Sequence, residues 1–341
     1  MNDTAANLKP LIAKVANGEC LNQTEAVEAF DIIMSGNATP AQIGGFLMAL
    51  RVRGETVDEI TGAAKTMRAK ALKVSAPDNA MDIVGTGGDG SGSYNISTAA
   101  AIVTAACGIP IAKHGNRNLS SKSGASDVLA SLGVNLDADL PTVEKAIDEA
   151  NIGFLMAPLY HGAMKHVGGP RVELGTRTIF NLLGPLTNPA GVKRQFSGAF
   201  SRDWIVPMAT VLGNLGCEKA WVVHGSDGLD ELTTTGLSYV AELSHGKVNE
   251  LEVSPEDAGI ERAHPQDLKG GDPDYNAKAL KAVVDGISGP YRDVVLYNCA
   301  AALLIADKAT NLKDGVAQAK AAIDDGRARE TLDKLVAITN G

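Results

Sequence analysis

The residues best suited to chemistry lie between Asp82 and Asp127, where glycine, serine, asparagine and basic residues are concentrated between apolar runs. A short apolar run leads into Gly85-Thr-Gly-Gly-Asp89, and a helical pattern follows from Thr98. A glycine-rich loop between a strand and a helix presents backbone N–H groups to phosphates. A second loop, rich in basic and hydroxyl side chains, follows at residues 113–124. Together the two loops predict a ligand with more than one phosphate group.

The glycine loop also matches the dinucleotide fingerprint G-x-G-x-x-G, from Gly85 to Gly90, but two features oppose that interpretation. The polar segment 91–97 separates the fingerprint from the apolar helix, whereas a Rossmann helix begins inside the fingerprint. The next strand-like run ends in Lys113-His114, where a Rossmann fold places an acidic residue for the ribose hydroxyls. A purely structural glycine turn stays open as an alternative, although Asp89, Asn95 and Ser97 add polar groups that a turn does not require.

The second loop combines backbone freedom with hydrogen-bond donors. In Lys113-His-Gly-Asn-Arg117, Gly115 permits an unusual backbone angle, and the lysine, asparagine and arginine side chains supply donors. Ser120, Ser121, Ser123 and Gly124 then precede Asp127, which is consistent with a second helix start that binds an anion. A solvated surface loop is the alternative interpretation of these residues.

Three other sites lie further along the chain. Asp230-Glu231 follows the strand-like Trp221–His224 and a glycine turn, and a pair of carboxylates there suits Mg²⁺, although adjacent acids on loops are common. Arg171 follows Gly-Gly-Pro and has the forked geometry to bind a carboxylate, with a surface arginine as the alternative. His161 and His166 are five residues apart, which is the wrong spacing for one helix face, so we reject a zinc site.

Composition limits the function classes. The chain has 341 residues, is 45% hydrophobic and 21% charged, and carries a net charge of -9, which opposes a general role on nucleic acid or on membrane surfaces. The four cysteines stand far apart without metal-binding spacing, so we expect reduced thiols in a cytoplasmic protein. No signal segment and no run long enough to span a bilayer is evident.

The first part of the chain, residues 1–75, predicts a small helical domain. Capping-box spacing marks three helix starts, Asn22 with Glu25, Thr39 with Gln42, and Thr56 with Glu59. Gly36 and Gly54 stand where two of these helices should end.

Residues 76–341 predict a larger α/β domain with a mainly parallel sheet covered by helices. Strand-like runs alternate with helical stretches, and Ser97 and Thr98 are expected to cap the helix after the glycine loop, with phosphate or metal contact as an equally open role. The segment 168–189 breaks this alternation, so we expect residues of about 165–190 to join the helical domain. The strand-like runs are Asp82–Val84, Ile109–Lys113, Ile152–Met156, Arg194–Phe200 and Lys219–His224.

Taken together, these motifs resemble those of the anthranilate phosphoribosyltransferases, a branch of the nucleoside phosphorylase-like phosphoribosyltransferase family. The resemblance extends over effectively the whole chain, and the joint occurrence of the motifs is specific where one glycine motif is not. It departs at Ala125, where the family commonly has serine, so a hydroxyl contact with phosphate is lost there or moved to Ser126. The resemblance rests on segments 85–89, 95–98, 113–117, 120–124 and 181–189, on Arg171 and on Asp230-Glu231.

The resemblance implies a role for each matching residue. Anthranilate is expected to contact Gly85, Asn116 and Arg171, and the cofactor Mg²⁺ is expected at Ser97, Asp230 and Glu231. No general base is assigned, because the amine of anthranilate is largely neutral at pH 7. The residues expected to bind phosphoribosyl pyrophosphate are Gly85, Gly88, Asp89, Ser93, Asn95, Ile96, Ser97, Thr98, Lys113, His114, Gly115, Asn116, Arg117, Asn118, Leu119, Ser120, Ser121 and Ala125.

The implied activity is transfer of the 5-phosphoribosyl group from phosphoribosyl pyrophosphate to the amine of anthranilate, with release of pyrophosphate, in tryptophan biosynthesis. The implied fold is a small helical domain plus a larger α/β domain, with a homodimer formed through the helical part. Two alternatives stay open. A pyrimidine nucleoside phosphorylase-like enzyme usually carries a Lys-His-Ser-Thr-Gly-Gly pattern that this chain lacks, and a non-catalytic nucleic-acid-binding relative is opposed by the acidic charge.

Overall fold

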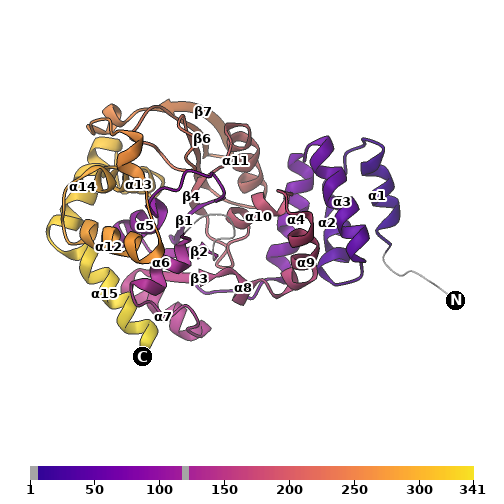
Figure 1. Cartoon of the computed structure of the whole chain (residues 1–341), viewed down its shortest axis with the longest axis horizontal. Helices are drawn as coiled ribbons and strands as arrows, with labels where there is room; N and C mark the ends of the chain where they lie inside the picture. The colour runs from indigo at the N-terminus through magenta and orange to yellow at the C-terminus, as the bar shows by residue number, and fades with distance from the viewer. Residues whose placement is uncertain (1–6, 117–122) are drawn as a thin grey trace.

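Four helices form the N-terminal bundle in the computed structural model of the chain, which describes residues 7–116 and 123–341. All three predicted capping boxes are present, with Asn22, Thr39 and Thr56 each accepting the backbone N–H three residues on. The bundle stands beside the α/β part, at the right of Figure 1. Its helices are α1 (Lys9–Ala16), α2 (Gln23–Met34), α3 (Pro40–Arg53) and α4 (Val57–Lys70).

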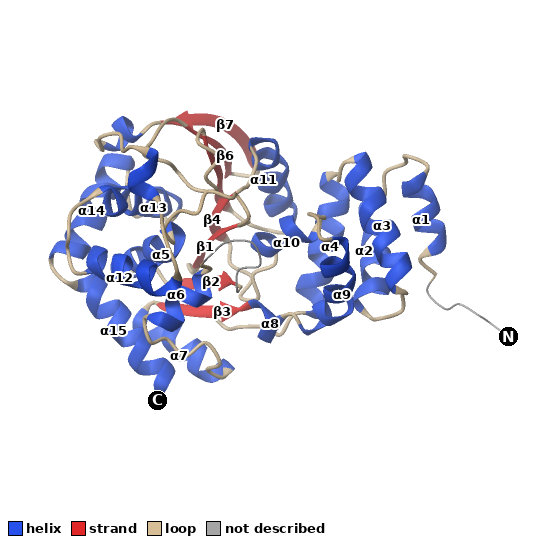
Figure 2. Cartoon of the chain, viewed as in Figure 1, coloured by secondary structure: helices blue, strands red, loops and turns tan. Residues whose placement is uncertain are grey.

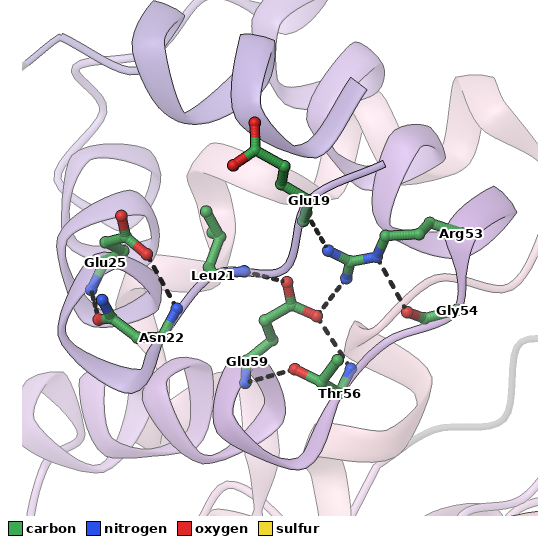
Figure 3. Close-up of polar contacts among 8 residues, drawn as sticks. All are labelled: Glu19, Leu21, Asn22, Glu25, Arg53, Gly54, Thr56 and Glu59. Carbon is green, nitrogen blue, oxygen red and sulfur yellow. Dashed lines mark hydrogen bonds and ion pairs between the residues drawn. The ribbon is translucent and has the colours of Figure 1, made fainter. Parts of the chain in front are cut away.

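One buried carboxylate connects the ends of three of these helices (Figure 3). Glu59 is fully buried and accepts the backbone N–H groups of Leu21 and Thr56, each at 2.9 Å. It also pairs with the guanidinium of Arg53, which in turn donates to the carbonyl of Glu19. A buried charge is tolerated where it is paired and fully hydrogen-bonded, so this contact joins the α1–α2 loop to the ends of α3 and the start of α4.

Over its described residues, the larger part of the chain contains a seven-stranded sheet, drawn in red in Figure 2. Its order is β3-β2-β1-β4-β5-β6-β7, and the first five strands in that order are parallel to one another. This confirms the predicted mainly parallel sheet. The strands are β1 (Met81–Gly85), β2 (Ile111–Gly115), β3 (Ile152–Met156), β4 (Arg194–Gly198), β5 (Lys219–Gly225), β6 (Ser238–Ser244) and β7 (Lys247–Val253).

The antiparallel pair β6 and β7 was not predicted, although the sequence carries a signal for it. His245 and Gly246 have φ of 52° and 72°, and Ser244 pairs with Lys247 across them. Two residues of positive φ form the hairpin turn whose twist matches that of the flanking strands. The hairpin was missed because its first turn residue is histidine, whereas Asn-Gly is the usual sequence signal for such a turn.

Helices cover both faces of the sheet, and alternate residues of β5 show the two sides. Trp221 and Val223 belong to the core formed with α5 and α12–α15, whereas Ala220 and Val222 belong to the core that runs through α11 into the bundle. Almost every residue of α13 is buried. These helices are α5 (Ile96–Ala106), α6 (Ala125–Ser131), α7 (Leu140–Ala150), α8 (Ala157–Tyr160), α11 (Ile205–Asn214), α12 (Pro273–Val284), α13 (Pro290–Ile305), α14 (Leu312–Asp324) and α15 (Arg327–Asn340).

The glycine- and proline-rich segment after β3 forms two further helices, α9 (Lys165–Leu174) and α10 (Phe180–Leu186). Helix α9 packs against α2 and α3, and α10 packs against α4 and α11. The ring of Phe180 meets that of Phe30 edge-on, with 5.8 Å between centroids. This segment therefore contributes to the core of the bundle and lies between the bundle and the sheet (Figure 1).

Two predicted helix starts were displaced. Helix α5 begins at Ile96 with Asn95 at its N-cap position, so the prediction that Ser97 and Thr98 cap it was wrong. The N–H of Ser97 is instead bound by the carboxylate of Glu231, which comes from a distant part of the chain. Helix α6 begins at Ala125, two residues before the expected start at Asp127. Asp127 lies in the first turn, where its carboxylate accepts the N–H of Gly124 at 2.9 Å.

Replacing Glu59 by glutamine should lower the free energy of unfolding by about 1–3 kcal/mol, because one acceptor is lost at a fully buried site that receives three donors. Urea denaturation of the variant measures the effect. Asp203→Asn, at an exposed helix end, is the control and should change the free energy of unfolding by much less. Equal stability of Glu59→Gln and the parent chain would contradict the assigned role.

Candidate active site

Two adjoining pockets lie where the carboxyl ends of the parallel strands meet, the edge at which open α/β sheets bind ligands. One, here named the polar pocket, has a volume of about 230 Å³, and the other, the apolar pocket, about 530 Å³. Both are lined by residues 84–88, at the end of β1 and just beyond it, and by residues 114–116 at the end of β2. These two segments therefore form a wall shared by the pockets.

The polar pocket collects the predicted phosphate-binding residues. The predicted residues Arg117, Asn118, Leu119, Ser120 and Ser121 lie outside the described part of the chain. Every other residue predicted to bind the donor or a metal lines this pocket: Gly85, Gly88, Asp89, Ser93, Asn95, Ile96, Ser97, Thr98, Lys113, His114, Gly115, Asn116, Ala125, Asp230 and Glu231.

Asp230 and Glu231 are buried and each binds a backbone N–H group of the pocket wall. The Asp230 carboxylate accepts from Gly87 at 2.8 Å, and the Glu231 carboxylate accepts from Ser97 at 3.0 Å. A Cβ atom at Gly85 would overlap the carboxylate of Asp230, which explains why this position needs glycine. The adjacent acids are therefore held inside the pocket and are not a solvated pair.

Burial changes the acidity of both carboxyls. It raises the pKa of Asp230 to about 7, and the negative charge of Asp89 adds to that effect. Burial and the neighbouring Asp230 likewise raise the pKa of Glu231 well above its usual range. Two carboxyls that resist ionisation side by side are suited to binding a cation, which would remove their mutual repulsion.

The donor set fits a divalent cation that is shared with a phosphate ligand. Within residues 7–116 and 123–341, no group of three or more histidine, cysteine, aspartate and glutamate side chains is placed to hold a metal. Mg²⁺ typically takes one or two carboxylates and completes its coordination with phosphate oxygens and water. The pair Asp230 and Glu231, with the hydroxyl of Ser97 in the same pocket, provides that kind of partial site.

Lys113 carries the buried positive charge of the polar pocket. Its ammonium donates to the carbonyl of Ile83, and the residue is only 2% exposed. Burial lowers its pKa, whereas the charges of Asp82, Glu231 and Asp230 oppose that change. The ammonium of Lys113 thus lies in the same pocket as the carboxylates. This combination is suited to a ligand that brings both phosphate and a metal ion.

The apolar pocket is closed on its far side by α4, α9 and α10. Arg171 of α9 lines it, with its guanidinium carbon 5.3 Å from the centroid of the Phe180 ring. Gly85 and Asn116, which were expected to contact anthranilate together with Arg171, line the same pocket from the shared wall. A largely apolar space lined by the guanidinium of Arg171 suits an aromatic molecule that carries a carboxylate.

Sequence reasoning missed one histidine of the apolar pocket, His161. His161 was considered only as a zinc ligand, yet it lines this pocket with its ring centroid 5.1 Å from that of His114. Burial lowers the pKa of His114 to about 3 and that of His161 to about 4, so both rings are neutral at pH 7. His166, in contrast, lies against Gly36 of the bundle. No local pattern distinguishes these two roles.

The far half of the glycine loop is held by a segment that the sequence did not single out. Gly92 accepts the N–H of Gly270 at 2.9 Å, and the N–H of Tyr94 donates to Leu268 at 3.1 Å. The ring of Tyr94 stacks on that of Tyr291, with centroids 4.2 Å apart. These contacts fix the loop from Gly92 to Tyr94, whereas its near half, Gly87 and Gly88, is held by Asp230 and by Arg177.

Without a bound cation, the raised pKa of Asp230 should make the chain less stable as the pH rises. The folded pKa of about 7 lies above the ordinary value of 3.8, so the contribution to stability is present at low pH and lost as the pH rises through 7. Asp230→Asn should therefore raise the melting temperature at pH 8 by about 4 °C or more, and by much less at pH 5. Thermal melts with a chelator present measure the difference, and an equal effect at both pH values would contradict the assignment.

Two family models match the chain in succession. Residues 9–71 match the helical bundle domain of a glycosyl transferase family, and residues 77–329 match the a/b domain of that family. The chain is 64% identical to the anthranilate phosphoribosyltransferase of Azospirillum brasilense, over 98% of this chain and 94% of the relative. It is 61% identical to that of Rhodospirillum rubrum, over 98% of this chain and 96% of the relative.

Solved structures agree with this relationship. The anthranilate phosphoribosyltransferase from Thermus thermophilus superposes with a TM-score of 0.92 at 42% identity, over 97% of this chain and 99% of that one. The Saccharomyces cerevisiae enzyme in complex with PRPP and Mg gives a TM-score of 0.89 at 30% identity, over 99% of both chains. The motifs, the fold and these relatives agree over the same residues, and the chain belongs to the anthranilate phosphoribosyltransferase family.

Proposed function

We propose that this chain transfers the 5-phosphoribosyl group of phosphoribosyl pyrophosphate to the amine of anthranilate and releases pyrophosphate, a step of tryptophan biosynthesis. The observation that carries the proposal is the wall shared by the two pockets, residues 84–88 and 114–116. A donor in the polar pocket and an acceptor in the apolar pocket would meet at this wall. Holding two reactants in contact lowers the barrier to their reaction by removing the entropy cost of encounter.

In the proposed complex, the phosphates of the donor lie in the polar pocket. The N–H groups of the glycine loop and the ammonium of Lys113 stabilise its negative charge. Asp230, Glu231 and Ser97 would hold Mg²⁺, which when bound to pyrophosphate stabilises the charge that develops on the leaving group. The solved structure of the yeast relative in complex with PRPP and Mg supports a donor that binds together with Mg²⁺.

The acceptor is proposed to lie between Arg171 and the shared wall. The guanidinium of Arg171 would bind the carboxylate of anthranilate, and the side chain of Asn116 and the backbone of Gly85 would direct the amine toward the ribose. The amine is already a neutral nucleophile at pH 7, so the proposal needs no general base. The neutral rings of His114 and His161 fit this view, because they add no charge that would compete for the carboxylate.

The loss of anthranilate fluorescence tests the proposed function directly. The purified chain is mixed with anthranilate, phosphoribosyl pyrophosphate and Mg²⁺, and the signal should fall only when all are present. Uridine with orthophosphate is the control for the pyrimidine nucleoside phosphorylase alternative. Turnover of that pair, with no reaction of anthranilate, would overturn the proposal.

We also propose a homodimer formed through the helical bundle. Val52 of α3 and Val172 of α9 are 82% and 77% exposed, and the two helices pack side by side. Exposed apolar side chains on two neighbouring helices would favour contact with a second copy. Within the described residues, no helix has the length and apolar character to cross a membrane. A cytoplasmic location stays a prediction from the sequence.

Arg171→Ala should raise the KM for anthranilate by about tenfold to a hundredfold, because a charge-assisted bond to the carboxylate is lost. The KM for phosphoribosyl pyrophosphate should change by less than about threefold, since Arg171 lines the apolar pocket and not the polar one. Arg202→Ala removes an exposed guanidinium stacked on Tyr239 and is the matched control. Equal increases in both KM values would count against the carboxylate contact.

The double variant Asp230→Asn with Glu231→Gln should abolish Mg²⁺-dependent turnover while the chain stays folded. Both substitutions keep the size of the side chain and an acceptor for the N–H groups of Gly87 and Ser97, but they remove the charge that binds the cation. Initial rates over a Mg²⁺ titration measure the effect. Near-normal turnover would show that the cation binds elsewhere.

A further inference from the structure

The two strands that lead into the shared wall are unusually poorly paired with each other. Strand β1 pairs with β4 at five successive positions, and β2 pairs with β3 at five. Between β1 and β2, over the described residues of both strands, the pairing is limited to Met81 opposite Ile111. The remaining backbone groups on the facing edges of these strands need other partners.

Side chains supply those partners. The carboxylate of Asp82 on β1 accepts the N–H of His114 on β2 at 3.1 Å, and the ammonium of Lys113 donates to the carbonyl of Ile83. The amide of Asn188, from the loop before β4, donates to the carbonyl of Ala112 at 2.8 Å. Three groups that a regular ladder would pair directly are thus bonded through side chains.

Asp82 and Asn188 form one rigid unit within this gap. The amide of Asn188 donates to the second oxygen of Asp82 at 2.7 Å, while its own oxygen accepts the N–H of Ala190 at 2.8 Å. Both side chains are buried, at 0% and 1% exposure. The amide cannot rotate without losing its bonds to Ala112 and Ala190, so its orientation is determined by the backbone around it.

Neither residue touches a pocket, yet both strands end at the shared wall. Asp82 and Asn188 are absent from the linings of the polar and the apolar pocket, whereas residues 84–88 and 114–116 line both. The separation of these two wall segments is set by the length of the Asp82–Asn188 unit and not by direct bonds between peptides. Apolar side chains could fill such a space, but they would leave the N–H of His114 and the carbonyl of Ala112 unbonded.

We infer that Asp82 and Asn188 are positioning residues of the transfer reaction, which hold the ends of β1 and β2 at the separation that the donor and the acceptor require. The inference rests on the proposed function, since it concerns the wall at which the two substrates would meet. Buried polar groups that form a complete network specify one geometry more strictly than apolar packing does. The negative charge of Asp82 also attracts the ammonium of Lys113, so the same unit helps to hold the Lys113 side chain in place.

Four variants separate positioning from charge and from general stability. Asp82→Asn places two N–H donors face to face in either orientation of the new amide, because Asn188 donates to one oxygen of Asp82 and the backbone N–H of His114 donates to the other. Asn188→Ala removes the bridge but leaves the charge of Asp82 in place. The double variant Asp82→Asn with Asn188→Asp restores the hydrogen bond between the two positions but loses the donor to the carbonyl of Ala112. Glu59→Gln, a buried carboxylate of the bundle far from both pockets, is the matched control.

We expect Asp82→Asn and Asn188→Ala each to lower kcat/KM for phosphoribosyl pyrophosphate by about tenfold to a hundredfold, as displaced reactive groups do. The double variant should recover part of the loss. Glu59→Gln should melt earlier but keep its kcat/KM at temperatures where it is folded. Hydrogen exchange of residues 111–116 should be faster in Asp82→Asn than in the parent chain.

Calorimetry measures the binding of inorganic pyrophosphate in the presence of Mg²⁺. This measurement does not depend on the proposed function, because it needs no anthranilate. Inactivity of the parent chain with anthranilate would refute the function, while weaker pyrophosphate binding by the variants would still support the positioning role. Pyrophosphate binding and turnover of Asn188→Ala at the level of the parent chain would overturn the inference. A loss of activity in Asp82→Asn but not in Asn188→Ala would also overturn it, because the effect would then come from the charge of Asp82. If Asp82→Asn does not fold, Asn188→Ala and the double variant decide the question.

Discussion

The close approach of Asp230 to the ends of β1 and β4 is the contact on which the site depends. Gly85 and Gly198 are register partners on these adjacent parallel strands, and a Cβ atom on either would overlap Asp230. Their two missing side chains leave a notch that admits the carboxylate and backbone of Asp230. The next residue, Glu231, then reaches the first turn of α5 and binds the N–H of Ser97. One backbone notch thus places the acids, the glycine loop and a helix start together.

The buried carboxylates of the chain lie in two different environments. One environment compensates the negative charge and serves the fold, and the other leaves the charge under-compensated and suits a functional site. Glu59 in the bundle is surrounded by two backbone N–H groups and the guanidinium of Arg53, so its charge is compensated within the fold (Figure 3). Asp230 and Glu231 are buried beside each other, and their raised pKa values reflect that burial and mutual repulsion. A carboxylate pair left under-compensated is unfavourable for folding and favourable for cation binding, which is the usual compromise at a functional site.

The two pockets require both parts of the chain. The described residues that line the polar pocket come from strand ends, loops and helix starts of the α/β part, whereas the apolar pocket also takes Met67 from α4 and Arg171 and Phe180 from the α9–α10 segment. Helix α11 and one face of β5 share a continuous apolar core with the bundle. The bundle is therefore anchored to the sheet by the same segment that lines the apolar pocket, so packing between the two parts and the shape of that pocket cannot change independently.

The sequence by itself determined what depends on neighbours along the chain: the three capping boxes, the parallel α/β pattern, the glycine loop, and the residue types of the proposed donor, acceptor and metal sets. Tertiary structure alone decided which of these meet. The bond from Gly87 to Asp230 spans 143 residues and that from Asn188 to Asp82 spans 106, and no local periodicity encodes such pairings. His161 and the Asp82–Asn188 unit went unrecognised for this reason. Their roles arise from burial and from partners that only the folded chain brings within reach, because local patterns specify conformation whereas contacts between distant segments specify environment.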